Sequence, residues 1–327
     1  VESGTSFNTA TGWMEVQKRI RKSNNRERMI KILSYAAAVL VPVFFVGISL
    51  KYTTHDYFSN KSVLIAQPIL PGAAKAILTL DNGETINLNK ETADALQTIE
   101  GTNIQIDSTT LNYQLAQSTS VSPKPVYNKV EIPRGGEYAL VLSDGTKVHL
   151  NSMSSLRFPV AFTTGKREVE LQGEAYFEVS KTGQPFIVNA NGMQVEVLGT
   201  TFNISAYPDE EYQTTLVNGS VKVSAEKGES LILKPSQQAT IALGSNSIQV
   251  RTVDTSFYTS WVKGKINFKD QRLEDIMKTL SRWYDMNVVY ENEKLKNIRF
   301  GCNLNRYEEI TPFVKLLEKT EEVHVKI

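Results

Sequence analysis

The order of apolar and polar residues divides the chain into stretches of different period. Residues 32–50 (ILSYAAAVLVPVFFVGISL) contain no charged residue. From residue 127 to about residue 251, apolar and polar residues alternate in short runs, which is typical of β-strands with one buried face. Beyond Trp261 the apolar residues recur at helical spacing in two places. The pattern predicts a membrane-anchored, mainly β protein that ends in a small α/β unit.

The apolar stretch at residues 32–50 predicts a single transmembrane helix. Nineteen helical residues span roughly 28 Å, close to the thickness of a hydrocarbon core of about 30 Å. A buried helix of a soluble protein and a cleaved signal peptide are the alternatives. The signal peptide is disfavoured because about thirty residues precede the stretch and no small-x-small cleavage site follows it.

The charges before this stretch predict its orientation. Residues 1–31 contain seven Lys or Arg residues and three Glu residues. A basic flank stays on the cytoplasmic side, so we expect everything after Lys51 to lie outside the inner membrane, in the periplasm of a two-membrane bacterium. The chain begins at Val1 rather than at Met, and apolar residues recur at helical spacing from Trp13 to Ile20. We therefore interpret residues 1–31 as the end of a larger cytoplasmic helical domain.

Two segments beyond the apolar stretch are similar to each other. Ala76–Asn89 (AILTLDNGETINLN) aligns with Tyr138–Asn151 (YALVLSDGTKVHLN) at a constant offset. Asn82–Gly83 and Asp144–Gly145 predict two-residue hairpin turns with positive φ at both central residues. The alignment predicts a duplicated β-hairpin rather than a solenoid array.

The remaining periplasmic sequence predicts a linker and an all-β domain. Glu91–Lys124, between the two hairpin copies, is polar and rich in Ser and Thr, so residues 51–125 are expected to form one hairpin and a linker. Residues 126–255 predict an all-β domain, with a further hairpin at Asn218–Gly219. A sandwich, a barrel-like fold and a solenoid-like roll all remain open.

Residues 256–327 predict a small α/β domain of the order βαββαβ. One helix is expected from Leu273 to Tyr284, with Asp270 as a cap, and a second is expected to begin at Thr311–Pro312. Strands are expected at the sequences NVVY and IRFGCNL and at residues 323–327.

Composition and charge exclude several classes of function. The chain of 327 residues has a net charge of +1, so nothing in its overall charge favours nucleic acid. It has one cysteine and three scattered histidines, so we expect no metal site, no cofactor and no metabolic activity. Glu168 and Glu170 alternate with apolar residues, and we interpret them as a solvated strand face rather than as a glycosidase pair.

Several ordered motifs resemble the FecR family of transmembrane sigma-factor regulators, in particular its Bacteroidetes members. The motifs are VEIPRGGEYALVLSDGTKVHLNSMSSLRFP, ELQGEAYFEV with PFIV, VEVLGTTFNISAYP, TTLVNGSVKV with LKPSQQA, and the ending from WVKGKINF to LEDIMKTLSRWYDMNVVYE. Ser236 departs from the pattern, because relatives usually carry Gly before Gln-Gln. The resemblance extends from about Tyr127 to Ile327.

The resemblance implies a function and a set of partners. Such proteins are anti-sigma factors: the cytoplasmic region binds an extracytoplasmic-function sigma factor. The periplasmic region contacts the N-terminal signalling domain of a TonB-dependent outer-membrane transporter. Periplasmic and intramembrane proteases then release the sigma factor. The C-terminal unit resembles the transporter's signalling domain, so pairing through sheet edges is expected. The partner-binding residues would come from one helix: Leu273, Ile276, Trp283 and Tyr284.

The same resemblance suggests self-cleavage, because some FecR-type proteins split at a Gly-Thr bond within the V-L-G-T-T-F motif. Here that bond is Gly199–Thr200. The hydroxyl of Thr200 would attack the carbonyl of Gly199 and form an ester that water hydrolyses. The structural alternative is a strand bend at Gly199 followed by an ordinary strand residue.

A rival function is direct glycan sensing by a membrane-tethered periplasmic β-domain. Its binding strip would be aromatic, with candidates Tyr207, Tyr212, Phe257 and Tyr258.

Overall fold

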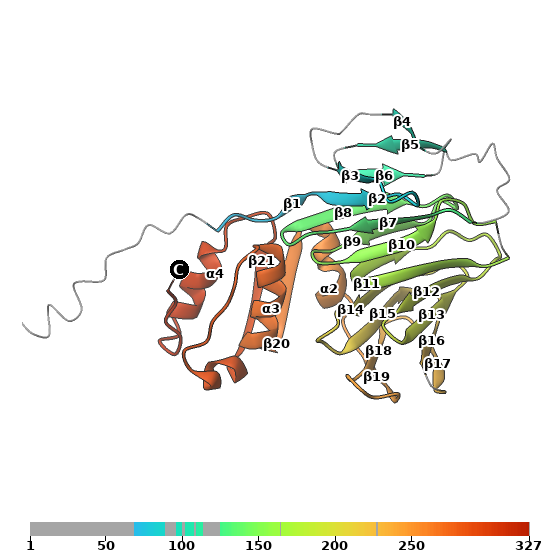
Figure 1. Cartoon of the computed structure of the whole chain (residues 1–327). Helices are drawn as coiled ribbons and strands as arrows, with labels where there is room; N and C mark the ends of the chain where they lie inside the picture. Colours follow the sequence, from blue (N-terminus) through green and yellow to red (C-terminus); the bar gives the residue numbers. More distant parts are fainter. Residues whose placement is uncertain are drawn as a thin grey trace, which may run out of the picture. The chain divides into compact units, whose positions relative to one another are not determined.

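The computed structural model describes residues 69–88, 96–99, 102–107, 109–113, 125–163, 165–226 and 228–326 (Figure 1). The transmembrane helix predicted at residues 32–50 and the cytoplasmic helix predicted within residues 1–31 lie outside these residues. Within the described ranges, no helix is long and apolar enough to cross a membrane.

The duplicated hairpin is confirmed, with a turn that differs from the predicted one. β2 (Ala76–Thr79) pairs with β3 (Thr85–Leu88), and β8 (Gly136–Val141) pairs with β9 (Lys147–Leu150). In each turn only the glycine has positive φ, 85° at Gly83 and 82° at Gly145. The preceding residue stays right-handed because its side chain, Asn82 or Asp144, accepts a backbone hydrogen bond two residues ahead.

The β-domain consists of two sheets that share one long strand. Sheet I has the order β3-β2-β7-β10-β11-β12-β13-β16-β17, and sheet II has the order β4-β5-β6-β8-β9-β11-β14-β15-β18-β19, while β1 (Ala73–Ala74) pairs in parallel with β8. The further bounds are β7 (Tyr127–Glu131), β10 (Ser155–Pro159), β11 (Arg167–Glu178), β12 (Phe186–Ala190), β13 (Met193–Val197), β14 (Thr201–Ala206), β15 (Tyr212–Asn218), β16 (Val221–Ala225), β17 (Ser230–Leu233), β18 (Gln237–Ile241) and β19 (Ile248–Thr252).

The shared strand β11 changes sheet at a glycine. Its first half pairs with β10 and β12 in sheet I, and its second half pairs with β9 and β14 in sheet II. Gly173 has φ +83° at this bend, and a Cβ there would lie 2.5 Å from the Ser154 hydroxyl, so no larger residue fits.

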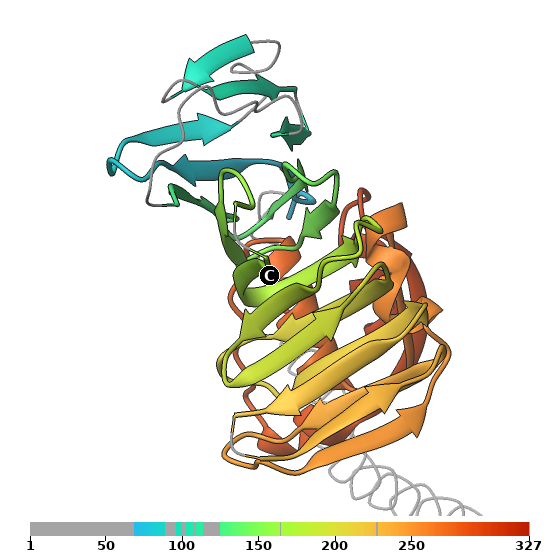
Figure 2. The ribbon, with the colours of Figure 1, turned by 90° about the vertical axis from the view of Figure 1, so that its right-hand side faces the viewer.

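The chain then places pairs of strands alternately in the two sheets. Figure 2 shows strands of the β-domain stacked one above another. The hairpin predicted at Asn218–Gly219 is therefore wrong. β15 pairs with β14 and β18 in sheet II, whereas β16 pairs with β13 and β17 in sheet I. Gly219, with φ +97°, is a corner between sheets, because an Asn-Gly pair supplies positive φ without dictating which strands pair.

The predicted linker also differs. The segment Glu91–Lys124 contains β4 (Leu96–Ile99), β5 (Thr102–Ile106) and β6 (Thr110–Asn112). Ile106, Leu111 and Tyr113 are buried in the same hydrophobic core as both hairpin copies. A mostly polar segment therefore packs on the sheet through these few apolar residues.

Residues 256–326 form the C-terminal module. Its elements are α2 (Ser256–Thr259), the 3-10 helix η1 (Ser260–Lys263), β20 (Lys265–Arg272), α3 (Leu273–Trp283), the 3-10 helix η2 (Glu293–Asn297), β21 (Arg299–Asn305) and α4 (Thr311–Glu318). The two predicted helices and the strand IRFGCNL are confirmed.

The other two strands predicted in this module are wrong. NVVY (residues 287–290) and residues 323–326 form no strand. Tyr290 and Val325 pack on the module's core, but neither segment joins the sheet β20-β21. The predicted cap is also wrong: Arg272 precedes α3, and Asp270 has φ +49° in an irregularity of β20.

Candidate functional site: the junction of the two modules

The β-domain and the C-terminal module have separate hydrophobic cores and meet through polar groups. One core is built from the two sheets, and the other from α3, α4, β20 and β21. The contacts between them, which we call the junction, are hydrogen bonds, ion pairs and cation–π contacts from Arg306, Trp261, Arg282 and Arg134.

Arg306 is the most deeply buried cation of the junction, with 1% of its side chain exposed. Its guanidinium donates to Asn151 Oδ1 and lies 3.3 Å from the Glu137 carboxylate, both in the β-domain. It also stacks on the Trp283 ring, 3.7 Å from the centroid, and the Trp283 indole N–H donates to the Arg306 carbonyl. A planar guanidinium can stack and donate at once, whereas lysine cannot do both.

Glu174 organises the β-domain side of the junction. Its carboxylate accepts from Asn151 Nδ2 (2.6 Å) and from Asn203 Nδ2 (2.9 Å). The oxygen of each amide accepts in turn from the C-terminal module: Asn151 from Arg306, and Asn203 from the indole N–H of Trp261 (3.2 Å). Because both amide oxygens are engaged, both NH₂ groups must face Glu174.

Opposing effects act on the pKa of Glu174. Burial raises the pKa of Glu174, and the hydrogen bonds from Asn203 and Asn151, with the charges of Arg282 and Arg306, act in the opposite direction. Burial dominates, so the pKa of this carboxyl group lies above its ordinary value.

A second anchor joins α3 to the turn between β14 and β15. Arg282 forms an ion pair with Glu210, and both side chains are largely buried, at 14% and 24% exposed. The guanidinium lies over the ring of Tyr207, 3.9 Å from its centroid, and the Tyr207 hydroxyl donates to the Ser152 carbonyl. Burial raises the pKa of Tyr207, so this hydroxyl stays protonated.

A third anchor lies in the loop before β8. Arg134 donates to the carbonyl of Met286 (2.6 Å) and lies 3.2 Å from the Asp285 carboxylate. The next residue, Gly135, donates its backbone N–H to the Arg282 carbonyl.

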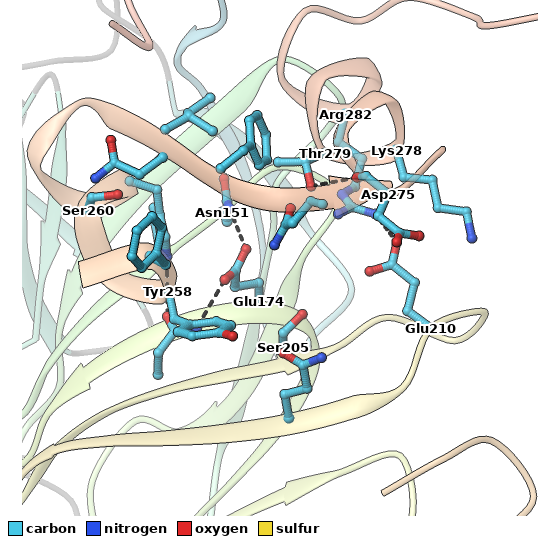
Figure 3. A pocket seen from close by; sticks show the side chains of 18 of the residues that line it. Asn151, Glu174, Ser205, Glu210, Tyr258, Ser260, Asp275, Lys278, Thr279 and Arg282 are labelled. Carbon is cyan, nitrogen blue, oxygen red and sulfur yellow. Dashed lines mark hydrogen bonds and ion pairs between the residues drawn. The ribbon is translucent and has the colours of Figure 1, made fainter. Parts of the chain in front are cut away.

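The junction encloses a cleft of about 650 Å³ (Figure 3). Its two walls differ in charge. Glu174, Asp209, Glu210 and Glu211 lie on the wall of the β-domain. The wall of the C-terminal module carries six cations in addition to Arg306: Lys265, Lys269, Arg272, Lys278, Arg282 and Arg299. Arg282–Glu210 is the ion pair that crosses between these walls at α3.

The four predicted partner-binding residues are buried rather than exposed. Leu273, Ile276, Trp283 and Tyr284 all belong to the core of the C-terminal module. They hold α3 in place, so a partner would contact other side chains of the module. That the module as a whole binds a partner stays a prediction.

The four aromatic residues of the glycan hypothesis do not form one strip. Phe257 and Tyr258 line the cleft, Tyr207 is buried beneath Arg282, and Tyr212 packs against the core of the β-domain.

The bond Gly199–Thr200 lies far along the chain from the junction residues of α3, before β14. Thr200 is 5% exposed, and its hydroxyl donates to the carbonyl of Ser220 at 3.0 Å. A Cβ on Gly199 would lie 2.2 Å from Cγ of Lys181, so the Lys181 stem covers this glycine. In this state the Thr200 hydroxyl is directed toward the turn at Gly219–Ser220.

In the part of the chain that the structure describes, no three His, Cys, Asp or Glu side chains cluster as metal ligands. The single cysteine, Cys302, is half-buried against the core of the C-terminal module, and burial raises its pKa to about 11. A thiol with such a pKa is a poor nucleophile.

Sequence reasoning missed the junction. Glu174 lies on the same face of β11 as Glu168 and Glu170, which are exposed as predicted. Periodicity does not reveal that a later module covers one end of that face. Arg306 is a single cation beside an aromatic residue in a loop, and no sequence motif marks it.

Comparison with known proteins agrees with this architecture. A family model described as "FecR protein" matches residues 128–222, and one described as "FecR, C-terminal" matches residues 265–327. Two crystal structures of a candidate anti-sigma factor from Parabacteroides distasonis ATCC 8503 are similar to this chain at 26% identity. One has a TM-score of 0.57 and matches 61% of this chain and 94% of the other; the second has 0.54, 62% and 94%. No protein of curated function matches the sequence.

The first match falls within the β-domain and the second within the C-terminal module, in the order in which the modules occur here. The protein thus has a two-module, FecR-type architecture: a two-sheet β-domain is followed by a small α/β module. Residues 128–222 are thus similar to FecR proteins, and residues 265–327 are similar to the C-terminal region of FecR.

Proposed function

We propose that this protein is an anti-sigma factor that carries a signal across the inner membrane. The observation that supports this most strongly is the two FecR matches in tandem, together with the similarity to the candidate anti-sigma factor of Parabacteroides distasonis over nearly all of that chain. Its partner is an extracytoplasmic-function sigma factor, bound on the cytoplasmic side by the region at residues 1–31. The apolar stretch at residues 32–50 anchors the protein, and the two modules lie in the periplasm.

On the periplasmic side, the C-terminal module binds the N-terminal signalling domain of a TonB-dependent outer-membrane transporter. An unpaired segment of the module supports this choice. Residues 288–290 belong to no helix or strand, form no backbone–backbone hydrogen bond to other described residues, and include Val289, which is 87% exposed. A partner strand could pair with such a segment and cover its exposed side chain.

Transporter occupancy then leads to proteolysis by periplasmic and intramembrane proteases and to release of the sigma factor. Self-cleavage at Gly199–Thr200 is a separate, single-turnover step. It requires the Thr200 hydroxyl to leave the Ser220 carbonyl and turn toward the carbonyl carbon of Gly199.

The experiment that tests the function is a transcription measurement combined with binding. Deleting the gene should derepress promoters of the sigma factor encoded beside it, and that sigma factor should co-purify with the full chain. A chain without residues 261–327 should no longer bind the signalling domain of the transporter. Unchanged transcription after deletion of the gene would contradict the anti-sigma role.

A second candidate function rests on the cleft. Its volume of about 650 Å³, the aromatic side chains of Tyr258 and Trp261 and the surrounding amides suit a polyhydroxylated ligand such as an oligosaccharide. Calorimetric binding of a neutral oligosaccharide to the full chain in the absence of transporter would favour direct sensing.

A further inference from the structure

The chain enters the described structure through a segment that lies between the two modules. This segment, Ile69–Ala74, follows the apolar stretch predicted to cross the membrane, and we call it the strap. At one end of the strap, Ile69 packs against the core of the C-terminal module. At the other end, β1 pairs with β8, with Ala73 opposite Gly136 and the Ala73 N–H bonded to the Gly135 carbonyl.

The middle of the strap is enclosed from both sides. A Cβ on Gly72 would lie 2.6 Å from the Gly135 carbonyl oxygen and 2.7 Å from the ring of Trp283. The strap therefore runs between a loop of the β-domain and an indole of the C-terminal module, with room for glycine only.

The same indole is part of the junction. Trp283 carries the guanidinium of Arg306 on its ring and donates to the Arg306 carbonyl. It is the neighbour of Arg282, which pairs with Glu210. Movement of the C-terminal module away from the β-domain would thus remove the Trp283 ring from Gly72 and the core contact from Ile69 together.

The junction is suited to such movement. The two hydrophobic cores are separate, and the contacts between the modules are largely polar, as in interfaces between domains that move. The C-terminal module follows β19 through residues 253–255, so it can swing on one covalent connection.

We propose that the C-terminal module clamps the strap and thereby masks a proteolytic site between the membrane and the β-domain. When the module undocks, the strap loses its packing, and an endoprotease hydrolyses a peptide bond within it, adding one water across the bond. Leu70, which is 62% exposed, offers an apolar side chain for recognition. This inference rests on the proposed signalling role, and it names the element on which proteolysis depends.

Limited proteolysis of the purified full chain tests the clamp without sigma factor or transporter. The probe is thermolysin, which cuts before bulky apolar residues, and mass spectrometry counts new termini within residues 69–75. Glu210→Arg breaks the ion pair with Arg282 and should raise the rate of strap cleavage about tenfold, since cleavage follows the open population when reclosing is fast. The double variant Glu210→Arg/Arg282→Glu re-forms an ion pair but loses the cation over the Tyr207 ring, so its rate should lie between those of wild type and Glu210→Arg.

Two further variants complete the design. Glu226→Arg makes the same charge change at an exposed position of the β-domain outside the junction cleft and should leave strap cleavage unchanged. Gly72→Ala leaves the Arg282–Glu210 pair intact but forces the strap from its slot, so it should accelerate strap cleavage as well. Each rate is divided by the rate of cleavage within β12 (Phe186–Ala190), a largely buried strand of the β-domain that becomes accessible on unfolding.

The clamp is refuted if Glu210→Arg and Gly72→Ala leave the normalised strap rate at the wild-type value, or if Glu226→Arg raises it equally. Because no partner is present, a negative result here would leave the proposed anti-sigma function standing. Loss of that function would likewise leave the clamp intact.

Discussion

Replacement of Arg306 gives the sharpest measure of how the two modules are held together. Arg306→Ala removes the cation from the Glu137 carboxylate, which keeps only the hydrogen bond from the Tyr307 hydroxyl, and from the Trp283 ring. Breaking a buried ion pair costs about 3–5 kcal/mol. Glu137 is 22% exposed, and solvent screening therefore places the expected loss near the lower end, about 3 kcal/mol. Arg306→Lys keeps the positive charge but lacks the planar guanidinium that stacks on Trp283, so we expect about half that loss of stability.

The assay can use the protein's own tryptophans. Two of the three tryptophans, Trp261 and Trp283, lie beside Arg306, and the third is Trp13. In a Trp13→Phe background, urea unfolding followed by fluorescence therefore reports on the junction. The transition should move to lower urea in the order wild type, Arg306→Lys, Arg306→Ala. Coincident transitions for all three proteins would refute the reasoning, because a buried, paired cation cannot be removed without effect.

Three further predictions concern topology, self-cleavage and pH. A reporter fused after Tyr57 should be active only as a periplasmic reporter, and cytoplasmic activity there would contradict the predicted orientation. Mass spectrometry of the purified chain should find a new N-terminus at Thr200 that Thr200→Ala abolishes and Thr201→Ala retains; an intact wild-type chain after long incubation would exclude self-cleavage. The pKa of Glu174 is raised by burial, so its contribution to stability is present below its ordinary value of about 4.5 and is lost as pH rises through the raised pKa. The free energy of unfolding of wild type relative to Glu174→Gln should therefore fall as the pH rises above about 4.5, with Glu170→Gln as the exposed control on the same strand; a difference independent of pH would exclude a shifted carboxyl group.

Much of the fold could be predicted from local sequence signals. The repeated hairpins, the two helices of the C-terminal module and β21 each follow from apolar periodicity or turn residues within a short window. Pairing between distant strands did not follow. Asn218–Gly219 looked like a hairpin because a turn signal carries no information on which sheet the next strand joins.

The junction was beyond sequence reasoning for a related physical reason. Glu174 has the periodicity of a solvated strand face, and only the arrival of Trp261 and Arg306 some ninety or more residues later encloses it. Glu168, on the same face but outside the covered region, stays exposed as predicted. Burial that depends on docking between modules leaves no local pattern.

The central claim is that the C-terminal module receives the transporter's signal, and one binding measurement tests it most directly. The N-terminal signalling domain of the TonB-dependent transporter encoded beside this gene is titrated onto the immobilised full chain, without added cofactor. Val289→Asp changes the exposed residue of the unpaired segment, and Ile232→Asp makes the same change at an exposed position of the β-domain, 67% accessible. We expect wild type and Ile232→Asp to bind equally and Val289→Asp to bind at least about tenfold more weakly, since a charge would be placed against a pairing strand. Equal binding by all three, or loss of binding in Ile232→Asp alone, would contradict this assignment and move the signal-receiving surface to the β-domain.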